Sequence, residues 1–380
     1  MPAPLCSPYV TDAGQHALQL LRAAAVSLLV LYHVALLAPG APAGFLYGAL
    51  VRLGAMGWVG TDVLLALSGF LAVGSRGRSP GALAWLGRRA MRVLPPFAVF
   101  LLVYLYLVPS LIVAAGGPAE TLQTFELARR TQGYLWLMAT NLLMVMGRRP
   151  GAALEPLLTL GVGVQLTLVA ALLLSKTRPW ITVAGLALLE CSGFALRAAW
   201  LEGDAWRSYS FPLTRCDAFA SGMAMACLLS HPRWGERLRQ VRRLVVAVAG
   251  VGLVAVVVVT RGLPVHSKAT MLVGYPTVGV FCGALVLLLS QAERPRAWLQ
   301  RLAVAGSAAY AVYLVKLPAV FMVRHALEAW GSFTGLRGLL ELAALGLLTS
   351  GFIGGVFHLA VERPLARTTP RGVPVFGRTG

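Results

Sequence analysis

Charged residues are scarce in this sequence, and acidic residues are the scarcest. Only 12% of the 380 residues are charged, and 14 aspartates and glutamates stand against 33 lysines and arginines. Hydrophobic residues make up 58% of the chain, and the mean hydropathy is +0.74. A soluble domain of this size could not bury so much apolar surface, so the composition excludes a soluble globular protein and predicts an integral membrane protein.

Cysteine is also rare, and its placement indicates neither a disulfide framework nor a metal site. The cysteines are scattered, most of them lie within apolar runs, and no two have the spacing of metal ligands. We interpret them as small buried hydrophobic residues and expect no bound metal. They are Cys6, Cys191, Cys216, Cys227 and Cys282. A signal peptide is lacking too, so we expect the first apolar run to remain as a span.

The formal net charge of +19 raises the possibility of a nucleic-acid partner. The arginines, however, are confined to short loops between apolar runs, which is the positive-inside pattern of membrane proteins. We therefore expect membrane lipid as a partner, and no nucleic acid.

Ten apolar runs are long enough to cross a bilayer as helices of about 17 to 25 residues. They start near residues 17, 56, 95, 157, 180, 211, 244, 271, 304 and 338, with Pro95 opening the third. A shorter run, 133–147, would move every later loop to the other side if it crossed. We interpret it as a re-entrant or surface-lying helix within an outer connection, 116–156, which also leaves four arginines outside.

The inner loops then carry most of the positive charge. Their basic residues are Arg76, Arg78, Arg88, Arg89, Arg92, Lys176, Arg178, Arg233, Arg237, Arg239, Arg242, Arg243, Arg294, Arg296, Arg301, Arg363, Arg367, Arg371 and Arg378. Because each span must satisfy its own backbone polar groups, we predict an all-α polytopic membrane helical bundle of about ten transmembrane helices with both termini cytoplasmic. Residues 1–380 form one domain, with a core at 17–364 and a basic tail at 365–380.

The first span holds two ionisable residues, and each such residue in a membrane is unfavourable enough to need a reason. Arg22 lies at the inner end and His33 follows eleven residues later, about 16 Å along a helix. Histidine titrates near neutrality and can take a proton from a hydroxyl, so His33 is a candidate general base. Alternatively, it is a polar residue bonded to a neighbouring helix.

Asp62 lies within the second span, near its outer end. A carboxylate there could orient His33 or bind an acceptor, or it could form a structural ion pair. Arg88 and Arg92 are spaced i, i+4 and share a helix face at the inner surface. Two guanidiniums side by side suit phosphate, although ordinary positive-inside topology would also explain them.

Other embedded charges belong to later spans. Arg215 and Asp217 enter the span that starts near 211, and Glu190 and Arg197 lie seven residues apart on one helix face, as in a structural ion pair. Lys316 lies in mid-span with no partner visible in the sequence. Glu362 closes the last span, near the basic loops.

Six stretches, in this order, resemble the acyltransferase-3 family of membrane acyltransferases. The resemblance covers about residues 20–364. It consists of Arg22 to His33; GWVGTDVLLALSGFL with Asp62, Ser68 and Gly69; RRAMRVLPP with Arg88, Arg92 and Pro95; FPLTRCDAFASGMAMA with Arg215, Asp217 and Gly222; AGSAAYAVYLVKLPAV with Tyr310, Tyr313, Leu314 and Pro318; and FHLAVERPL with Glu362, Arg363 and Pro364.

The resemblance implies a membrane enzyme that moves an acyl group, here expected to be acetyl, from acyl-CoA to a hydroxyl of a surface glycan or lipid-linked saccharide. The donor is a substrate, and we expect no permanently bound cofactor. We expect His33 and Asp62 to be catalytic, and Arg22, Arg88 and Arg92 to hold the donor. We assign substrate binding to Arg215, Asp217, Tyr313, Lys316 and Glu362. The expected location is a bacterial cytoplasmic membrane.

Two departures from the family pattern leave other functions open. The family often has a W-S-L-x-x-E segment, but its carboxylate position falls on Gly163, and the histidine of its Y-L-x-H segment is replaced by Lys316. A degenerate member that binds donor or glycan without turnover would explain both. A transporter whose embedded charges form a solute path is a further alternative, and the sequence does not indicate the oligomeric state.

Overall fold

The computed structural model describes residues 10–368, except 41–43, 78, 80, 117–118, 175–178, 204, 294–296 and 332. Five predicted inner-loop residues, Arg78, Lys176, Arg178, Arg294 and Arg296, fall in these gaps. Cys6 and the tail from residue 369, with Arg371 and Arg378, also lie outside the described residues.

The described chain consists of helices joined by loops and contains no strand. The α-helices are α1 (Asp12–Leu36), α2 (Phe45–Ala55), α3 (Val59–Gly77), α4 (Ala82–Leu102), α5 (Val108–Ala114), α6 (Ala119–Arg130), α7 (Gln132–Trp136), α8 (Thr140–Val145), α9 (Leu157–Leu173), α10 (Pro179–Ala199), α11 (Ala205–Ser210), α12 (Asp217–Ser230), α13 (Pro232–Val259), α14 (Tyr275–Ser290), α15 (Ala297–Ser307), α16 (Ala309–Ala329), α17 (Gly335–Phe357) and α18 (Arg363–Thr368). Short 3₁₀ turns are η1 (Met56–Trp58), η3 (Ala152–Leu154) and η4 (Leu213–Arg215). Three π-helical turns, η2 (Val103–Leu107), η5 (Thr270–Gly274) and η6 (His358–Glu362), interrupt longer helices.

Nine segments of the described chain are helical, long and apolar enough to cross a membrane. They are Asp12–Leu36, Phe45–Arg76, Ala82–Ala114, Ala152–Leu173, Ile181–Ala199, Pro232–Val259, Thr270–Ser290, Ala309–Ala329 and Gly335–Ala366. The predicted run near 211 corresponds to α12, whose 14 residues extend about 21 Å. It is too short to cross a hydrocarbon core of about 30 Å by itself. The prediction of an all-α polytopic membrane bundle is confirmed, with one of the ten runs shortened.

Three boundaries differ from the sequence prediction, and one of them is the start of the span predicted near 244, which begins at Pro232. The second span begins at Phe45, because α2, η1 and α3 run on as one helical segment. The third begins at Ala82, so Pro95 lies inside α4 and does not open the span. The shorter run at 133–147 forms α7 and α8, neither of which is long enough to cross, as predicted.

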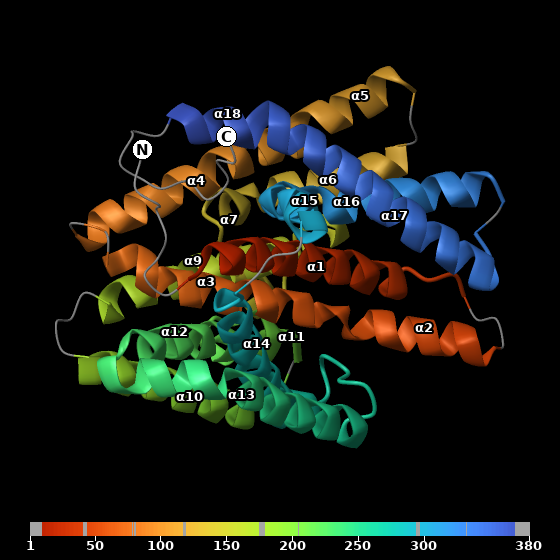
Figure 1. Ribbon diagram of the computed structural model, residues 1–380. Coiled ribbons are helices and arrows are strands. Elements are labelled where there is room, and N and C mark those ends of the chain that lie inside the picture. The colour runs from red at the N-terminus through yellow and green to blue at the C-terminus, as the bar shows by residue number, and fades with distance from the viewer. Residues whose placement is uncertain are drawn as a thin grey trace.

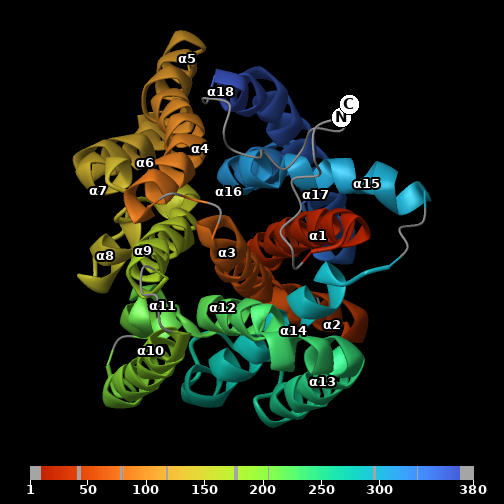
Figure 2. The ribbon, with the colours of Figure 1, turned by 60° about the vertical axis from the view of Figure 1, so that its left-hand side comes forward.

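The long helices α1 and α3 lie in the middle of the bundle, and the other helices surround them (Figure 2). On one side lie α10 and α12 to α14, and on the other lie α4, α5 and α16 to α18 (Figure 1). The start of α1, the start of α4 and the end of α18 lie at the same end of the bundle. This end carries the arginines of α4 and is called the arginine end below.

The contact between α3 and α12 depends on two glycines from different motifs of the sequence. A Cβ atom at Gly222 would overlap the carbonyl oxygen of Ala66, and one at Gly69 would overlap that of Phe219. Small residues that let helix backbones touch are typical of membrane bundles. This close contact brings Asp62, on α3, up to the segment that precedes α12.

Candidate active site

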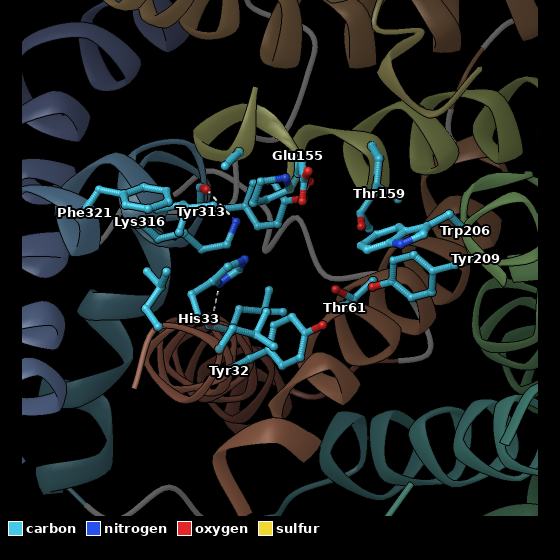
Figure 3. Close-up of a pocket in the computed structure, with 17 residues that line it drawn as sticks. Tyr32, His33, Thr61, Glu155, Thr159, Trp206, Tyr209, Tyr313, Lys316 and Phe321 are labelled. Carbon is cyan, nitrogen blue, oxygen red and sulfur yellow. Dashed lines mark hydrogen bonds between the residues drawn. The ribbon is translucent and has the colours of Figure 1, made fainter. Parts of the chain in front are cut away.

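A cavity of about 150 Å³ opens between α1, α3, α9, α11 and α16 (Figure 3). Its polar walls are formed by Tyr32, His33, Thr61, Glu155, Thr159, Trp206, Tyr209, Tyr313 and Lys316, and its apolar walls include Leu29, Leu36, Leu37, Leu317 and Phe321. A cavity of this volume accommodates a guest about as large as benzene. It therefore has room for a small acyl group at a reacting hydroxyl, and not for a whole nucleotide.

His33 reaches this cavity from the last turns of α1 and is only 8% exposed. Its Nδ1 atom lies 2.5 Å from the carbonyl oxygen of Leu29, one turn earlier. A carbonyl can only accept, so Nδ1 carries the hydrogen and Nε2 keeps its lone pair. The local helix geometry therefore holds the imidazole in the tautomer that a general base requires.

Two predicted substrate-binding residues of α16, Tyr313 and Lys316, lie on the opposite wall. Lys316 is 1% exposed and donates a hydrogen bond from Nζ to the carbonyl oxygen of Tyr313 at 2.9 Å. The Tyr313 hydroxyl donates to the carbonyl oxygen of Pro156, at the start of α9. The structure thus brings His33, Tyr313 and Lys316 to one cavity, although they come from opposite ends of the sequence.

Glu155 supplies a carboxylate to the cavity wall, although the sequence patterns did not predict it as a site residue. It directly precedes Pro156 and forms an ion pair with Arg149 at 3.2 Å. Arg149 also lies over the ring of Trp206, with its guanidinium carbon 4.7 Å from the ring centroid. Gly163, where the family pattern places its carboxylate, is not among the lining residues. In the sequence, only the position of Glu155 just before an apolar run indicates that this carboxylate could lie at a site within the membrane.

Asp62 does not hydrogen-bond to His33 in the described structure. Both of its oxygens accept hydrogen bonds from Nη2 of Arg215, at 3.0 and 3.1 Å. Both side chains are buried, so of the interpretations open at the sequence level the ion pair is the one that the geometry supports. Asp62 lies directly after Thr61, which lines the cavity, and so supports the wall from behind.

Three aromatic rings surround Arg215. Its guanidinium carbon lies 5.3 Å from the ring centroid of Trp58, 4.9 Å from that of Tyr209 and 4.4 Å from that of Tyr275. Burial lowers the pKa of the Arg215 guanidinium, but Asp62, Tyr275, Tyr209 and Asp217 together raise it by more, so the net pKa lies above its ordinary value. For the Tyr209 hydroxyl, burial raises the pKa, because it disfavours the charged phenolate. The hydroxyl therefore stays protonated and able to donate a hydrogen bond at the cavity.

Asp217 belongs to a second buried ion pair. Arg197 donates to its two oxygens at 2.7 and 2.9 Å, and also to the carbonyl oxygen of Thr214. The sequence suggested that Arg197 pairs with Glu190 on the same helix. Arg197 of α10 instead pairs with Asp217 of α12, and its side chain is 0% exposed. Glu190, Cys216 and Asp217 have ligand atoms within 4.8 Å of one another. We interpret these three residues as a structural cluster and not as a metal site. Arg197 already donates to both oxygens of Asp217, and its positive charge would repel a cation.

At the arginine end, three arginines from two helices come together. Arg22 of α1 interacts electrostatically with Arg89 and Arg92 of α4, and with Glu362 of η6. Glu362 is buried and accepts a hydrogen bond from His358 at 2.8 Å. The cluster of Arg22, Arg89 and Arg92, called the arginine cluster below, would suit the phosphates of a bound anion.

Arg88, which the sequence predicts to hold the donor together with Arg92, forms a different contact. It donates to the Ser79 hydroxyl in the loop before α4. Arg89 instead donates to the Ser68 hydroxyl of α3 at 2.7 Å and packs over the Trp85 ring. The spacing of Arg89 and Arg92, i and i+3, also places both on one helix face, and this signal was available from the sequence.

The described structure thus places His33 at a small cavity between the helices and the arginine cluster at one end of the bundle. The family model of the acyltransferase-3 acyltransferase domain matches residues 15–360. The chain therefore belongs to this family of membrane acyltransferases. No curated protein and no solved structure matches it.

Proposed function

We propose that the protein transfers an acetyl group from acetyl-CoA to a hydroxyl of a surface glycan or its lipid-linked precursor, in the cytoplasmic membrane of a bacterium. The observation that carries this proposal is the hydrogen bond from Nδ1 of His33 to Leu29, which leaves Nε2 as a base in a cavity of about 150 Å³. The cavity volume supports a short acyl group. The polar wall formed by Glu155, Thr61 and Tyr209 supports an acceptor that is rich in hydroxyls.

The arginine cluster would hold the donor. Coenzyme A carries several phosphate charges, and guanidiniums bind phosphate bidentately. Arg89 and Arg92 lie near enough to Arg22 to act on it electrostatically, whereas Arg88 is not among the charges that act on Arg22 and donates to Ser79 in the loop before α4. Arg22 and His33 lie on the same helix about 16 Å apart, a gap that the long pantetheine arm of the donor would bridge.

His33 would act as the general base. Its Nε2 takes the proton of the acceptor hydroxyl while the oxygen attacks the thioester carbonyl carbon. The carbon–sulfur bond then breaks, the thiolate takes that proton from His33, and an ester and free coenzyme A leave. Water would compete with the acceptor, and burial of the site limits that side reaction.

The test is transfer of labelled acetyl from acetyl-CoA by purified protein in lipid nanodiscs, with a lipid-linked saccharide as acceptor. His33→Gln should lose at least about 100-fold in kcat, the lower limit for a general base. His325→Gln is the matched control, because this histidine lies on α16 with a side chain that is 79% exposed. Full activity of His33→Gln would disprove the mechanism. Donor binding without turnover by the wild type would instead indicate a binding protein that has left catalysis.

A further inference from the structure

Lys316 has a surrounding that packing alone does not explain. Its amine is buried in the middle of α16, where it contacts the carbonyl oxygen of Tyr313 and lies 3.5 Å from the centroid of the Tyr313 ring. Among the described residues, no carboxylate forms an ion pair with it. A lysine in mid-membrane is unfavourable, and a methionine of similar length would fill the same space. A functional use of the amine accounts for this position.

The amine of Lys316 and the imidazole of His33 point toward each other across the cavity (Figure 3). Nε2 of His33 can only accept, because Nδ1 donates to Leu29. The amine has at least one N–H left after its bond to Tyr313, whether it is neutral or charged. An acceptor and a donor of hydrogen bonds therefore face each other over the space where a carbonyl group would react.

We propose that Lys316 is a catalytic residue whose Nζ–H donates a hydrogen bond to the thioester carbonyl oxygen as that oxygen becomes an oxyanion. This inference rests on the proposed acyl transfer and assigns it a second catalytic group. The acceptor oxygen forms its bond to the carbonyl carbon as His33 takes the hydroxyl proton. The electron pair of the C=O bond moves to oxygen, where Lys316 stabilises it.

Collapse of the intermediate restores the carbonyl and expels the thiolate, which receives the proton from His33. Lys316 keeps all its protons through the cycle, so the step needs no further reactant. Donors fixed in advance at a developing oxyanion, in a site with little water, give one of the largest single contributions to catalysis.

Two substitutions separate this role from a structural one. Lys316→Met removes the donor and keeps the length of the side chain. Lys316→His keeps an N–H donor, and histidine is the residue that the family pattern has at this position. Each variant is measured in nanodiscs for kcat, for KM toward acetyl-CoA, and for acetyl-CoA binding.

Loss of one oxyanion donor lowers kcat by about 100- to 1,000-fold. We expect this loss in Lys316→Met with KM and donor binding within twofold of the wild type, and kcat within tenfold of the wild type in Lys316→His. Wild-type kcat in Lys316→Met, or a change confined to KM, would overturn the proposal. If Lys316→Met does not fold, a 100-fold loss of kcat in folded, donor-binding Lys316→His would overturn it equally. No turnover by the wild type with any acyl-CoA would instead refute the proposed function.

Discussion

Arg215 and Asp62 are separated by 153 positions in the chain, yet one guanidinium nitrogen donates to both carboxylate oxygens at 3.0 and 3.1 Å. The pair connects two sequence motifs and lies behind the wall of the cavity. It is supported by the close contact of Gly69 and Gly222 with the facing helix backbones. Asp62 is therefore in contact with Arg215 and has no hydrogen bond to His33 in the described structure, so any effect of Asp62 on the cavity acts through the position of its wall.

Asp62→Ala should unfold the protein more easily because it leaves Arg215 buried and unpaired. Breaking a buried ion pair costs about 3–5 kcal/mol, whereas replacing both partners with apolar residues is often nearly neutral. We expect Asp62→Ala to lower the unfolding temperature strongly, and Asp62→Leu combined with Arg215→Met to recover much of the loss. Thermal unfolding in detergent measures both. A normal unfolding temperature with lost turnover would point instead to direct catalysis by Asp62.

Gly222→Ala should destabilise the fold because its Cβ atom would overlap the carbonyl oxygen of Ala66 and push α12 away from α3. Overpacking of a well-packed contact costs typically about 1–3 kcal/mol. The matched control is Gly351→Ala on α17, where a Cβ atom would have no neighbour within 4 Å. The free energy of unfolding should fall for the first variant and stay unchanged or rise for the second. Equal stability of the two would show that the helices separate readily.

The sequence was informative wherever hydrophobicity or local spacing decides the structure. Apolar runs predicted the spanning helices, and Lys316, placed in mid-span by the sequence, is buried. The partners of buried charges could not be predicted, because they depend on which helix faces meet. Arg197 thus pairs with Asp217 on another helix and not with Glu190 on its own.

The same limit applies to the arginine end. Two neighbouring arginines, Arg88 and Arg89, have nearly identical sequence surroundings but point to different partners, Ser79 in a loop and Ser68 on α3. Only the packing of α4 against α3 distinguishes them. The cavity itself combines residues from five helical segments, so its volume and its carboxylate, Glu155, were not accessible to reasoning along the chain.

Arg89→Gln should weaken binding of acetyl-CoA, whereas Arg88→Gln, its immediate neighbour, should have little effect. A hydrogen bond to a charged group contributes about 1.5–3 kcal/mol, which corresponds to a loss of about tenfold to 100-fold in affinity. Arg89→Lys should also bind less well, because an ammonium cannot bind phosphate bidentately. Binding of labelled coenzyme A to nanodiscs measures all three. A larger loss of affinity in Arg88→Gln than in Arg89→Gln would instead support the prediction from the sequence that Arg88 binds the donor.

Phe321→Ala should shift the acyl preference toward longer chains. The Phe321 ring lies at the apolar end of the cavity, next to Lys316 in the view of Figure 3, so its removal extends the space available to the acyl tail. One methylene in an apolar pocket is worth about 1–3 kcal/mol, or about 10- to 200-fold in kcat/KM. We therefore expect the ratio of kcat/KM for butanoyl-CoA over acetyl-CoA to rise at least about tenfold.

Met322→Ala is the matched control for this change, because Met322 is the next residue of α16 and is 54% exposed on the outside of the bundle. Its ratio should equal that of the wild type, since its side chain does not line the cavity. An equal rise in both variants would mean that the helix as a whole had loosened. An unchanged ratio in Phe321→Ala would mean that the acyl group is held elsewhere, because an enlarged apolar wall must favour the chain that fills it.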